Sequence, residues 1–80
     1  MTFITAFRLA TSWKRKVALV SLFHNARLSK NKHWKLINSA NYFNVSIGLI
    51  SENLKLSKNW DEIKECKSRN EALILLKGMK

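Results

Sequence analysis

Few side chains in this sequence have the types and spacing that catalysis needs. Neither histidine, His24 or His33, has an acidic neighbour in the sequence. Asp61, Glu62 and Glu65 fall together on one short predicted helix, a pattern more typical of a solvated face than of a general acid–base pair. The sequence therefore predicts no catalytic site and no small-molecule substrate.

The single cysteine, Cys66, points to packing rather than to chemistry. It excludes an internal disulfide and any multi-cysteine zinc site, and a half-buried packing role suits it better than that of a nucleophile. No glycine-rich phosphate loop or metal-ligand spacing is present. We therefore expect no metal and no cofactor, and a reducing compartment fits the cysteine usage.

Side chains suited to binding follow a different pattern, over Trp34–Leu56. Ala40, Asn44 and Ile50 have the spacing of two short helices joined by a tight turn, a helix-turn-helix. Such a unit projects the polar face of its second helix, which is what a reader of the DNA major groove needs. The pattern predicts double-stranded DNA as the partner.

The predicted DNA contacts are polar, small or basic residues of the second helix and of nearby helix starts. They are Lys35, Ser46, Ile47, Gly48, Ser51, Glu52, Lys55, Lys58, Arg69 and Asn70. Serine can donate or accept hydrogen bonds at base edges, and Gly48 lets the backbone approach closely. Glu52 either accepts from a cytosine amine or, as we favour, pairs with Lys55 or Lys58.

Two further sets of polar residues stay open in the sequence. Asn53, on the flank of the second helix, either reads adenine or faces solvent. Asn38 or Ser39, with Lys35, offers a phosphate contact at the start of the first helix of the unit.

The net charge of +10 in 80 residues is unevenly placed. Residues 1–51 contain eight Lys or Arg and no acid, whereas residues 52–80 contain seven Lys or Arg and five acids. Such a surface attracts polyanions. The basic residues from Lys14 to Lys35, with Lys14–Lys16 as a second patch among them, are expected to supply most of the electrostatic affinity.

The elements that must position these residues are all helical. The absence of proline and the presence of only two glycines leave little to interrupt helices. We predict an all-α, compact four- to five-helix domain over residues 1–80 with a central helix-turn-helix at about 34–56. The other helices fall at about 12–28, 59–66 and 69–78, with an optional short helix at Thr5–Ala10 and a loop at Ser29–His33.

Apolar residues at helical spacing predict which faces are buried. On the 12–28 helix they are Leu19, Leu22, Phe23 and Ala26, widened by Val17 and Val20. On the first helix of the unit they are Leu36, Ile37, Ala40 and Phe43, and on the second Ile47, Ile50 and Leu54, so that Ile47 belongs to both the buried and the contact sets. On the last helix they are Ala72, Leu73, Leu75 and Leu76.

The N-terminal segment resembles a targeting sequence only in composition. Met1–Lys16 has basic residues, hydroxyls and no acid, as organelle transit peptides do, but apolar residues continue beyond it. The apolar run that follows this segment, Val17–Val20, is far short of the roughly 20 residues that span a bilayer. We expect a cytoplasmic or nucleoid-associated protein with no membrane partner; a cationic helix lying on a membrane is the alternative.

Trp34–Leu56 followed by Lys67–Leu76 resembles the helix-turn-helix domain of ParB/KorB-type partition and regulatory proteins, and small helix-turn-helix proteins of phages and mobile elements. Val45–Ser51 is similar to their turn and recognition helix, and Ser68–Ala72 to the start of their next helix. The turn departs from their pattern, since Asn44 stands where glycine is commonest. The resemblance implies sequence-specific DNA binding in transcriptional regulation or in partition or replication control.

Three alternatives remain at this point. One is a small helical adaptor or inhibitor that binds a protein partner, and another is a non-specific nucleic-acid or RNA-binding module. The third concerns the N-terminal helix, which either completes the core or forms a homodimer surface, because DNA-binding modules of this size commonly pair on palindromic sites.

Overall fold

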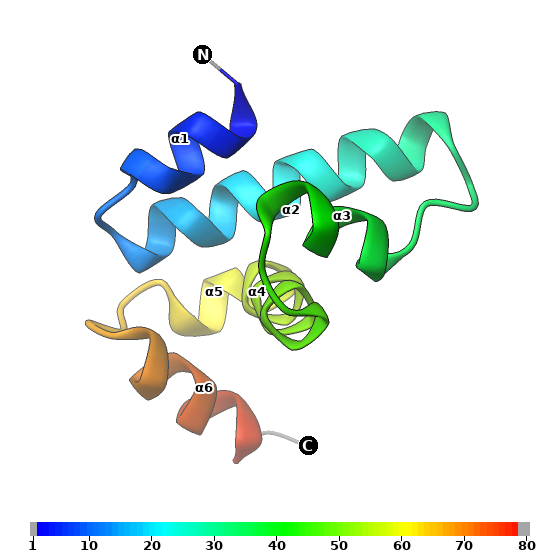
Figure 1. Ribbon diagram of the computed structural model, residues 1–80. Helices are drawn as coiled ribbons and strands as arrows, with labels where there is room; N and C mark the ends of the chain where they lie inside the picture. Colours follow the sequence, from blue (N-terminus) through cyan, green and yellow to red (C-terminus); the bar gives the residue numbers. More distant parts are fainter. Residues whose placement is uncertain (1, 79–80) are drawn as a thin grey trace.

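Six α-helices make up residues 2–78, the part of the chain described by the computed structural model (Figure 1). In chain order they are α1 (Phe3–Leu9), α2 (Trp13–Lys30), α3 (Leu36–Phe43), α4 (Ile47–Lys58), α5 (Trp60–Ile63) and α6 (Arg69–Lys77). No strand occurs in this range. The all-α prediction is confirmed. The sixth helix is α1, which overlaps the optional short helix expected at Thr5–Ala10.

The helix ends differ from prediction where the local signal is weak. α2 continues to Lys30, two residues into the predicted loop, and Asn31 ends it by donating its backbone N–H to the Arg27 carbonyl at 2.9 Å. The predicted 59–66 helix is only the single turn α5, after which Cys66 donates its backbone N–H to the Ile63 carbonyl at 2.9 Å.

Serine side chains cap the starts of three helices. Ser12, Ser46 and Ser68 each accept a hydrogen bond from a backbone N–H in the first turn that they precede. Ser68 and Glu71 of α6 form a modified capping box, because Glu71 accepts from the backbone N–H of Lys67, at 3.2 Å, one residue before the cap.

Asn44 makes the turn between α3 and α4. Its φ of 58° and ψ of 50° lie in the left-handed region, which asparagine tolerates better than other non-glycine residues. Asn44 donates its N–H to the Asn41 carbonyl at 3.3 Å, and Val45 donates to the Ala40 carbonyl at 3.0 Å. This pair of bonds is a Schellman ending, and it leaves only Asn44–Ser46 between the two helices.

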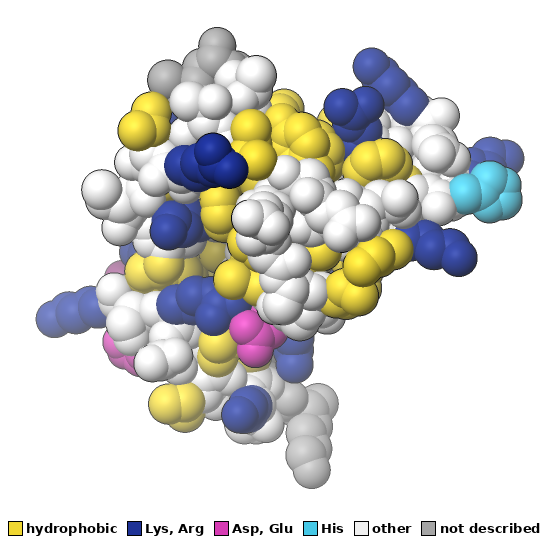
Figure 2. Space-filling model, viewed as in Figure 1, with side chains coloured by type: hydrophobic (Ala, Val, Ile, Leu, Met, Phe, Trp, Pro, Cys, Tyr) yellow, Lys and Arg dark blue, Asp and Glu magenta, His cyan; other side chains and the backbone are white. Residues whose placement is uncertain are grey.

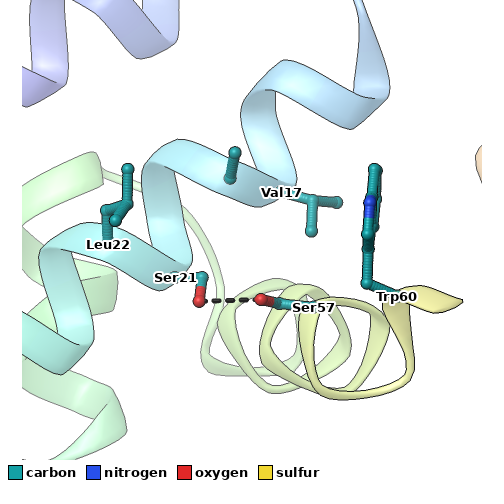
Figure 3. A pocket seen from close by; sticks show the side chains of 6 residues that line it. Val17, Ser21, Leu22, Ser57 and Trp60 are labelled. Atoms are coloured by element: carbon teal, nitrogen blue, oxygen red, sulfur yellow. Dashed lines mark hydrogen bonds between the residues drawn. The ribbon is translucent and has the colours of Figure 1, made fainter. Parts of the chain in front are cut away.

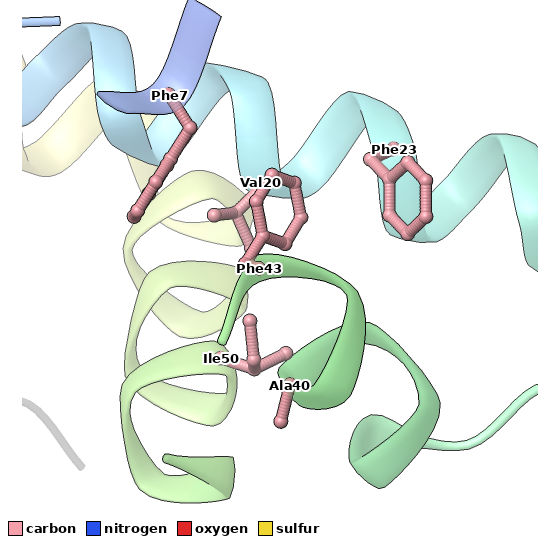
Figure 4. Close-up of a cluster of buried hydrophobic side chains, with 6 residues drawn as sticks. All are labelled: Phe7, Val20, Phe23, Ala40, Phe43 and Ile50. Carbon is pink, nitrogen blue, oxygen red and sulfur yellow. The ribbon is translucent and has the colours of Figure 1, made fainter. Parts of the chain in front are cut away.

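The first core cluster lies where four helices meet (Figure 4). It consists of Phe7 from α1, Val20 and Phe23 from α2, Ala40 and Phe43 from α3, and Ile50 from α4. Phe23 stacks on Tyr42 with 4.1 Å between ring centroids and meets Phe43 edge to face at 5.1 Å. The small Ala40 side chain, 2 % exposed, allows α3 and α4 to approach each other closely.

A second cluster fixes α5 and α6 to the other ends of α2 and α4. It contains Val17, Leu56, Ile63, Cys66, Ala72 and Leu76. α2 and α4 thus contribute to both clusters. In Figure 1, α4 is seen almost end-on beneath α2, so the two helices cross and form the centre of the fold. Cys66 is buried, which agrees with a packing role.

The buried face of α2 agrees with the prediction at Val17, Val20 and Phe23 and differs from it elsewhere. Val17, Val20, Ser21, Phe23 and His24 are buried. By contrast, Leu22 is 62 % exposed, and Ala26 is also exposed, so their predicted burial is wrong. The reason is that α4 covers the side of α2 that carries Val17, Ser21 and His24, and this side looks too polar in the sequence to be chosen. On the outer helices, the predictions for Ile37 and Leu75 fail similarly, since each is 43 % exposed.

Two buried polar side chains, His24 of α2 and Ser39 of α3, are satisfied inside the fold. Ser39, with 0 % exposure, accepts a hydrogen bond from Trp34 Nε1 at 2.8 Å, and its Oγ lies 2.7 Å from His24 Nδ1. A serine hydroxyl that accepts from the indole is available to donate to an unprotonated Nδ1. Burial lowers the pKa of the His24 imidazole below its ordinary 6.5, which favours the same neutral form.

Stability is therefore expected to fall as the pH drops from 7 to 5. The unfolded chain takes up a proton at His24 near its ordinary pKa, whereas the folded chain resists protonation, so acid favours unfolding. Thermal unfolding followed by circular dichroism at stepped pH measures the effect. His24→Asn should flatten the acid-side fall, and His33→Asn, at an exposed position, should retain it. A His24→Asn curve with the same fall as the original would contradict this assignment.

No helix among residues 2–78 is long and apolar enough to cross a membrane.

Candidate nucleic-acid interface

One side of α4 is open to solvent along its whole length. Ile47, Gly48, Ser51, Glu52, Lys55 and Lys58 are all exposed. At 100° per residue these positions fall on a single continuous face. The face begins at the turn after α3 and ends with the two lysines, so it has small and polar residues near the N-terminus and positive charge near the C-terminus.

The rotation of α4 differs from the predicted one. The buried residues are Ile50, Asn53 and Leu56, whereas Ile47, predicted to be buried, is 44 % exposed. Leu54 is only half-buried. The helix is turned so that Ile47 joins the open face, which agrees with its place in the predicted contact set and corrects its place in the buried stripe.

Gly48 lies in the first turn of the open face and its backbone is unstrained, since its φ is not positive. An added Cβ would meet only the Ser46 Oγ, at 3.9 Å, which is an ordinary contact. The fold therefore does not require glycine here. Ser46 Oγ accepts from the Leu49 backbone at 3.1 Å, so its cap role occupies part of its hydrogen-bonding capacity.

Glu52, Asn53 and Arg69 form a network on one edge of the open face. Arg69 Nη2 donates to Glu52 Oε1 at 2.8 Å, and Arg69 Nε and Nη2 donate to Asn53 Oδ1 at 3.3 and 3.2 Å. Glu52 thus has an ion-pair partner on α6 rather than Lys55 or Lys58. Asn53 is 2 % exposed, which corrects both predicted roles for it, adenine reader and solvated residue. Sequence reasoning missed this network because its partners lie sixteen and seventeen residues apart.

The predicted basic segment before α3 lies at one end of the molecule. The end of α2, the α2–α3 loop and the start of α3 bring together Arg27, Lys30, Lys32 and Lys35, all exposed. Figure 2 shows Lys and Arg side chains, with a histidine, projecting from this part of the surface. The Arg27 guanidinium lies 5.2 Å from the centroid of the Phe23 ring and 5.6 Å from that of Trp34, which holds its stem against the fold.

Not every predicted phosphate contact is available. Ser39 is fully buried, which excludes it as a phosphate contact. Asn38 Oδ1 accepts from the Lys35 backbone N–H at 2.9 Å, so this side chain is engaged in capping α3. Asn70 is exposed at the start of α6, whereas Arg69 is half-buried.

Lys14, Arg15 and Lys16 do not form one patch. Lys14 Nζ donates to the Lys64 carbonyl at 2.7 Å, Arg15 is exposed beside α1, and Lys16 Nζ lies 5.5 Å from the centroid of the Phe7 ring. Only Lys16 is directed toward the side of the molecule that carries the turn before α4.

A second surface feature is an apolar groove between α2 and the residues Ser57 and Trp60, shown in Figure 3. This groove, of about 380 Å³, is lined by Val17, Ala18, Ser21, Leu22, Ser57 and Trp60. Its two serines bond to each other, Ser57 Oγ donating to Ser21 Oγ at 2.8 Å, so the lining offers mainly apolar contact.

The acidic residues considered for chemistry lie on the surface. Asp61, Glu62 and Glu65 are exposed, and within residues 2–78 no three His, Cys, Asp or Glu side chains are grouped so as to hold a metal ion. Comparisons of this chain with protein-family models, with curated proteins and with solved structures gave no match.

Proposed function

We propose that this protein binds double-stranded DNA sequence-specifically, with the open face of α4 in the major groove. The observation that carries the proposal is the pairing of a three-residue left-handed turn with that face. α3 and the turn fix the start of α4, and the first two turns of α4 expose Ile47, Gly48 and Ser51, none of which is buried. A recognition helix needs this combination of rigid placement and unoccupied side chains.

The charge distribution supports a polyanionic partner. The basic end formed by Arg27, Lys30, Lys32 and Lys35 and the two lysines at the end of α4 leave six exposed cations on the elements of the unit and its flank. The only ion pair among residues 2–78 is Arg69–Glu52, so none of the six is neutralised by an acid of the same chain. Phosphate contacts of this kind position a protein on DNA, while base contacts supply the specificity.

The role that we propose is transcriptional regulation or control of DNA partition or replication, which is what the resemblance to ParB/KorB-type domains implies. A single module of this size binds with modest affinity, and a homodimer on a palindromic site is the common remedy. The exposed Leu22 and its groove on α2 are available for such pairing.

Binding is expected to weaken steeply with salt. If six phosphates are neutralised, the logarithm of affinity should fall with the logarithm of salt concentration at a slope of about −5. Fluorescence anisotropy of a labelled duplex from about 50 to 200 mM salt gives the slope. A slope close to zero, or no binding at about 50 mM, where electrostatic attraction is strong, would contradict nucleic-acid binding.

A second candidate function is that of an adaptor for a protein partner. The observation in its favour is the apolar groove of Figure 3, where Leu22 is 62 % exposed on its rim. Leu22→Lys separates the two candidates, because it should leave DNA binding by the monomer unchanged and abolish docking in the groove. Absence of DNA binding together with a Leu22-dependent complex would favour the adaptor.

A further inference from the structure

A cationic crevice runs along the flank of α4, on the side that faces α1, α2 and α6. It has a volume of about 440 Å³ and is lined by Phe7, Thr11, Trp13, Lys16, Val45, Leu49, Asn53 and Arg69. Two cations and no acid take part in the lining. Its floor is apolar and aromatic, which weakens the screening of these charges by water.

The hydrogen-bond donors of the crevice are only partly used. Lys16 Nζ makes no ion pair and no hydrogen bond within residues 2–78, and Arg69 Nη1 likewise makes none there. Asn53 Oδ1 is taken by Arg69, which fixes the orientation of the amide and leaves its Nδ2 without a bond among these residues. No fully buried side-chain nitrogen in this range lacks a partner, so Nδ2 must lie in the small accessible part of Asn53, which lines the crevice.

Three donor groups from three helices, α2, α4 and α6, therefore converge on one recess. A phosphate group has several acceptor oxygens and a negative charge, and it matches a lysine, an arginine edge and an amide N–H₂ better than a neutral ligand does. We propose that this crevice is a phosphate site that holds one backbone phosphate of the DNA lying along α4. This inference rests on the proposed function.

The position of the crevice gives the source of the phosphate. Arg69, which lines the crevice, pairs with Glu52 of the open face, so the crevice adjoins the edge of that face on the α6 side. A helix inserted in a major groove about 12 Å wide has a phosphate strand on each side. The strand on the α6 side passes over this recess, and Glu52 holds Arg69 at its edge through the 2.8 Å ion pair.

Lys16→Gln tests the site, with Lys77→Gln as a matched control at an exposed position on α6. The variant should flatten the salt dependence of DNA binding by about one in slope and weaken binding by roughly 5- to 10-fold at low salt, whereas the control should change neither. An equal slope in both variants, with DNA binding intact in the original protein, would overturn the phosphate site and leave the proposed function standing.

A second measurement uses inorganic phosphate alone, added at constant ionic strength. Saturable shifts of the Trp13 indole N–H and the Asn53 amide N–H₂ resonances, lost in Lys16→Gln, are the expected NMR result. No shift at either group would overturn the site. Lys16-dependent shifts in a protein that does not bind DNA would overturn both the proposed function and the DNA backbone as the source.

Discussion

Gly48→Glu is expected to weaken specific DNA binding by on the order of 100-fold while leaving the fold intact. A contact in the groove is worth roughly 1–3 kcal/mol, and a carboxylate there adds repulsion from the phosphates. The fold should survive because a Cβ at Gly48 meets only the Ser46 Oγ at 3.9 Å. A negative charge in the first turn of a helix is also favourable. Anisotropy on the preferred duplex measures the affinity, and circular dichroism measures the helix content.

Two controls separate charge from position. Gly48→Ala adds the Cβ without the charge and should cost less affinity. Ile74→Glu makes the same change in net charge at a side chain that is 70 % exposed on α6, away from the α4 face. If Ile74→Glu weakens binding as much as Gly48→Glu, the effect is one of net charge, and α4 is not the reader.

Ile50→Ala is expected to lower the stability of the domain more than any change on the open face. Ile50 is fully buried and joins α4 to the first core cluster, and truncation of such a side chain costs about 2–5 kcal/mol. For a domain of this length that corresponds to a fall in Tm of roughly 10 °C or more. Chemical denaturation followed by tryptophan fluorescence gives the free energy of unfolding.

Ile47→Ala is the matched control, with the same residue type one turn earlier in α4. Its side chain is 44 % exposed, so the loss of stability should stay below about 1 kcal/mol, while the loss of DNA affinity should exceed that of any folded Ile50 variant. Equal destabilisation by the two substitutions would show that the rotation of α4 described above is wrong.

The sequence predicts best what local interactions determine. The serine caps at Ser12, Ser46 and Ser68 were predictable, as was the left-handed turn at Asn44, because each depends on residues within a few positions. The spacing of Ala40, Asn44 and Ile50 predicted two short helices joined by a tight turn for the same reason.

The rotation of the helices was not predictable in the same way. On α4 the apolar pattern favours Ile47 and Leu54, but the fold buries the polar Asn53 because Arg69, from another helix, satisfies its Oδ1. On α2 the same thing occurs at His24, whose ring nitrogen meets Ser39. A polar residue cannot be recognised as buried from the sequence when its hydrogen-bond partner lies on another helix. The buried face is then predicted from the apolar residues alone, and part of it is misplaced.

In the candidate site, too, the residues of a single helix were predictable and the contacts between different helices were not. The predicted contact residues on α4, from Ser46 to Lys58, all lie on its exposed side, since helical periodicity places them together once one is outward. Lys16 and Asn53 were not predicted as neighbours of Arg69, because three different helices bring them to one crevice.

Selection of bound fragments from a pool of random double-stranded DNA tests the central claim most directly. The proposal predicts enrichment of one short motif by the original protein, with paired half-sites about one helical turn apart if it binds as a dimer, and loss of that enrichment in Gly48→Glu. Recovery of DNA without any enriched motif, or of the same motif by Gly48→Glu, would contradict sequence-specific recognition by α4.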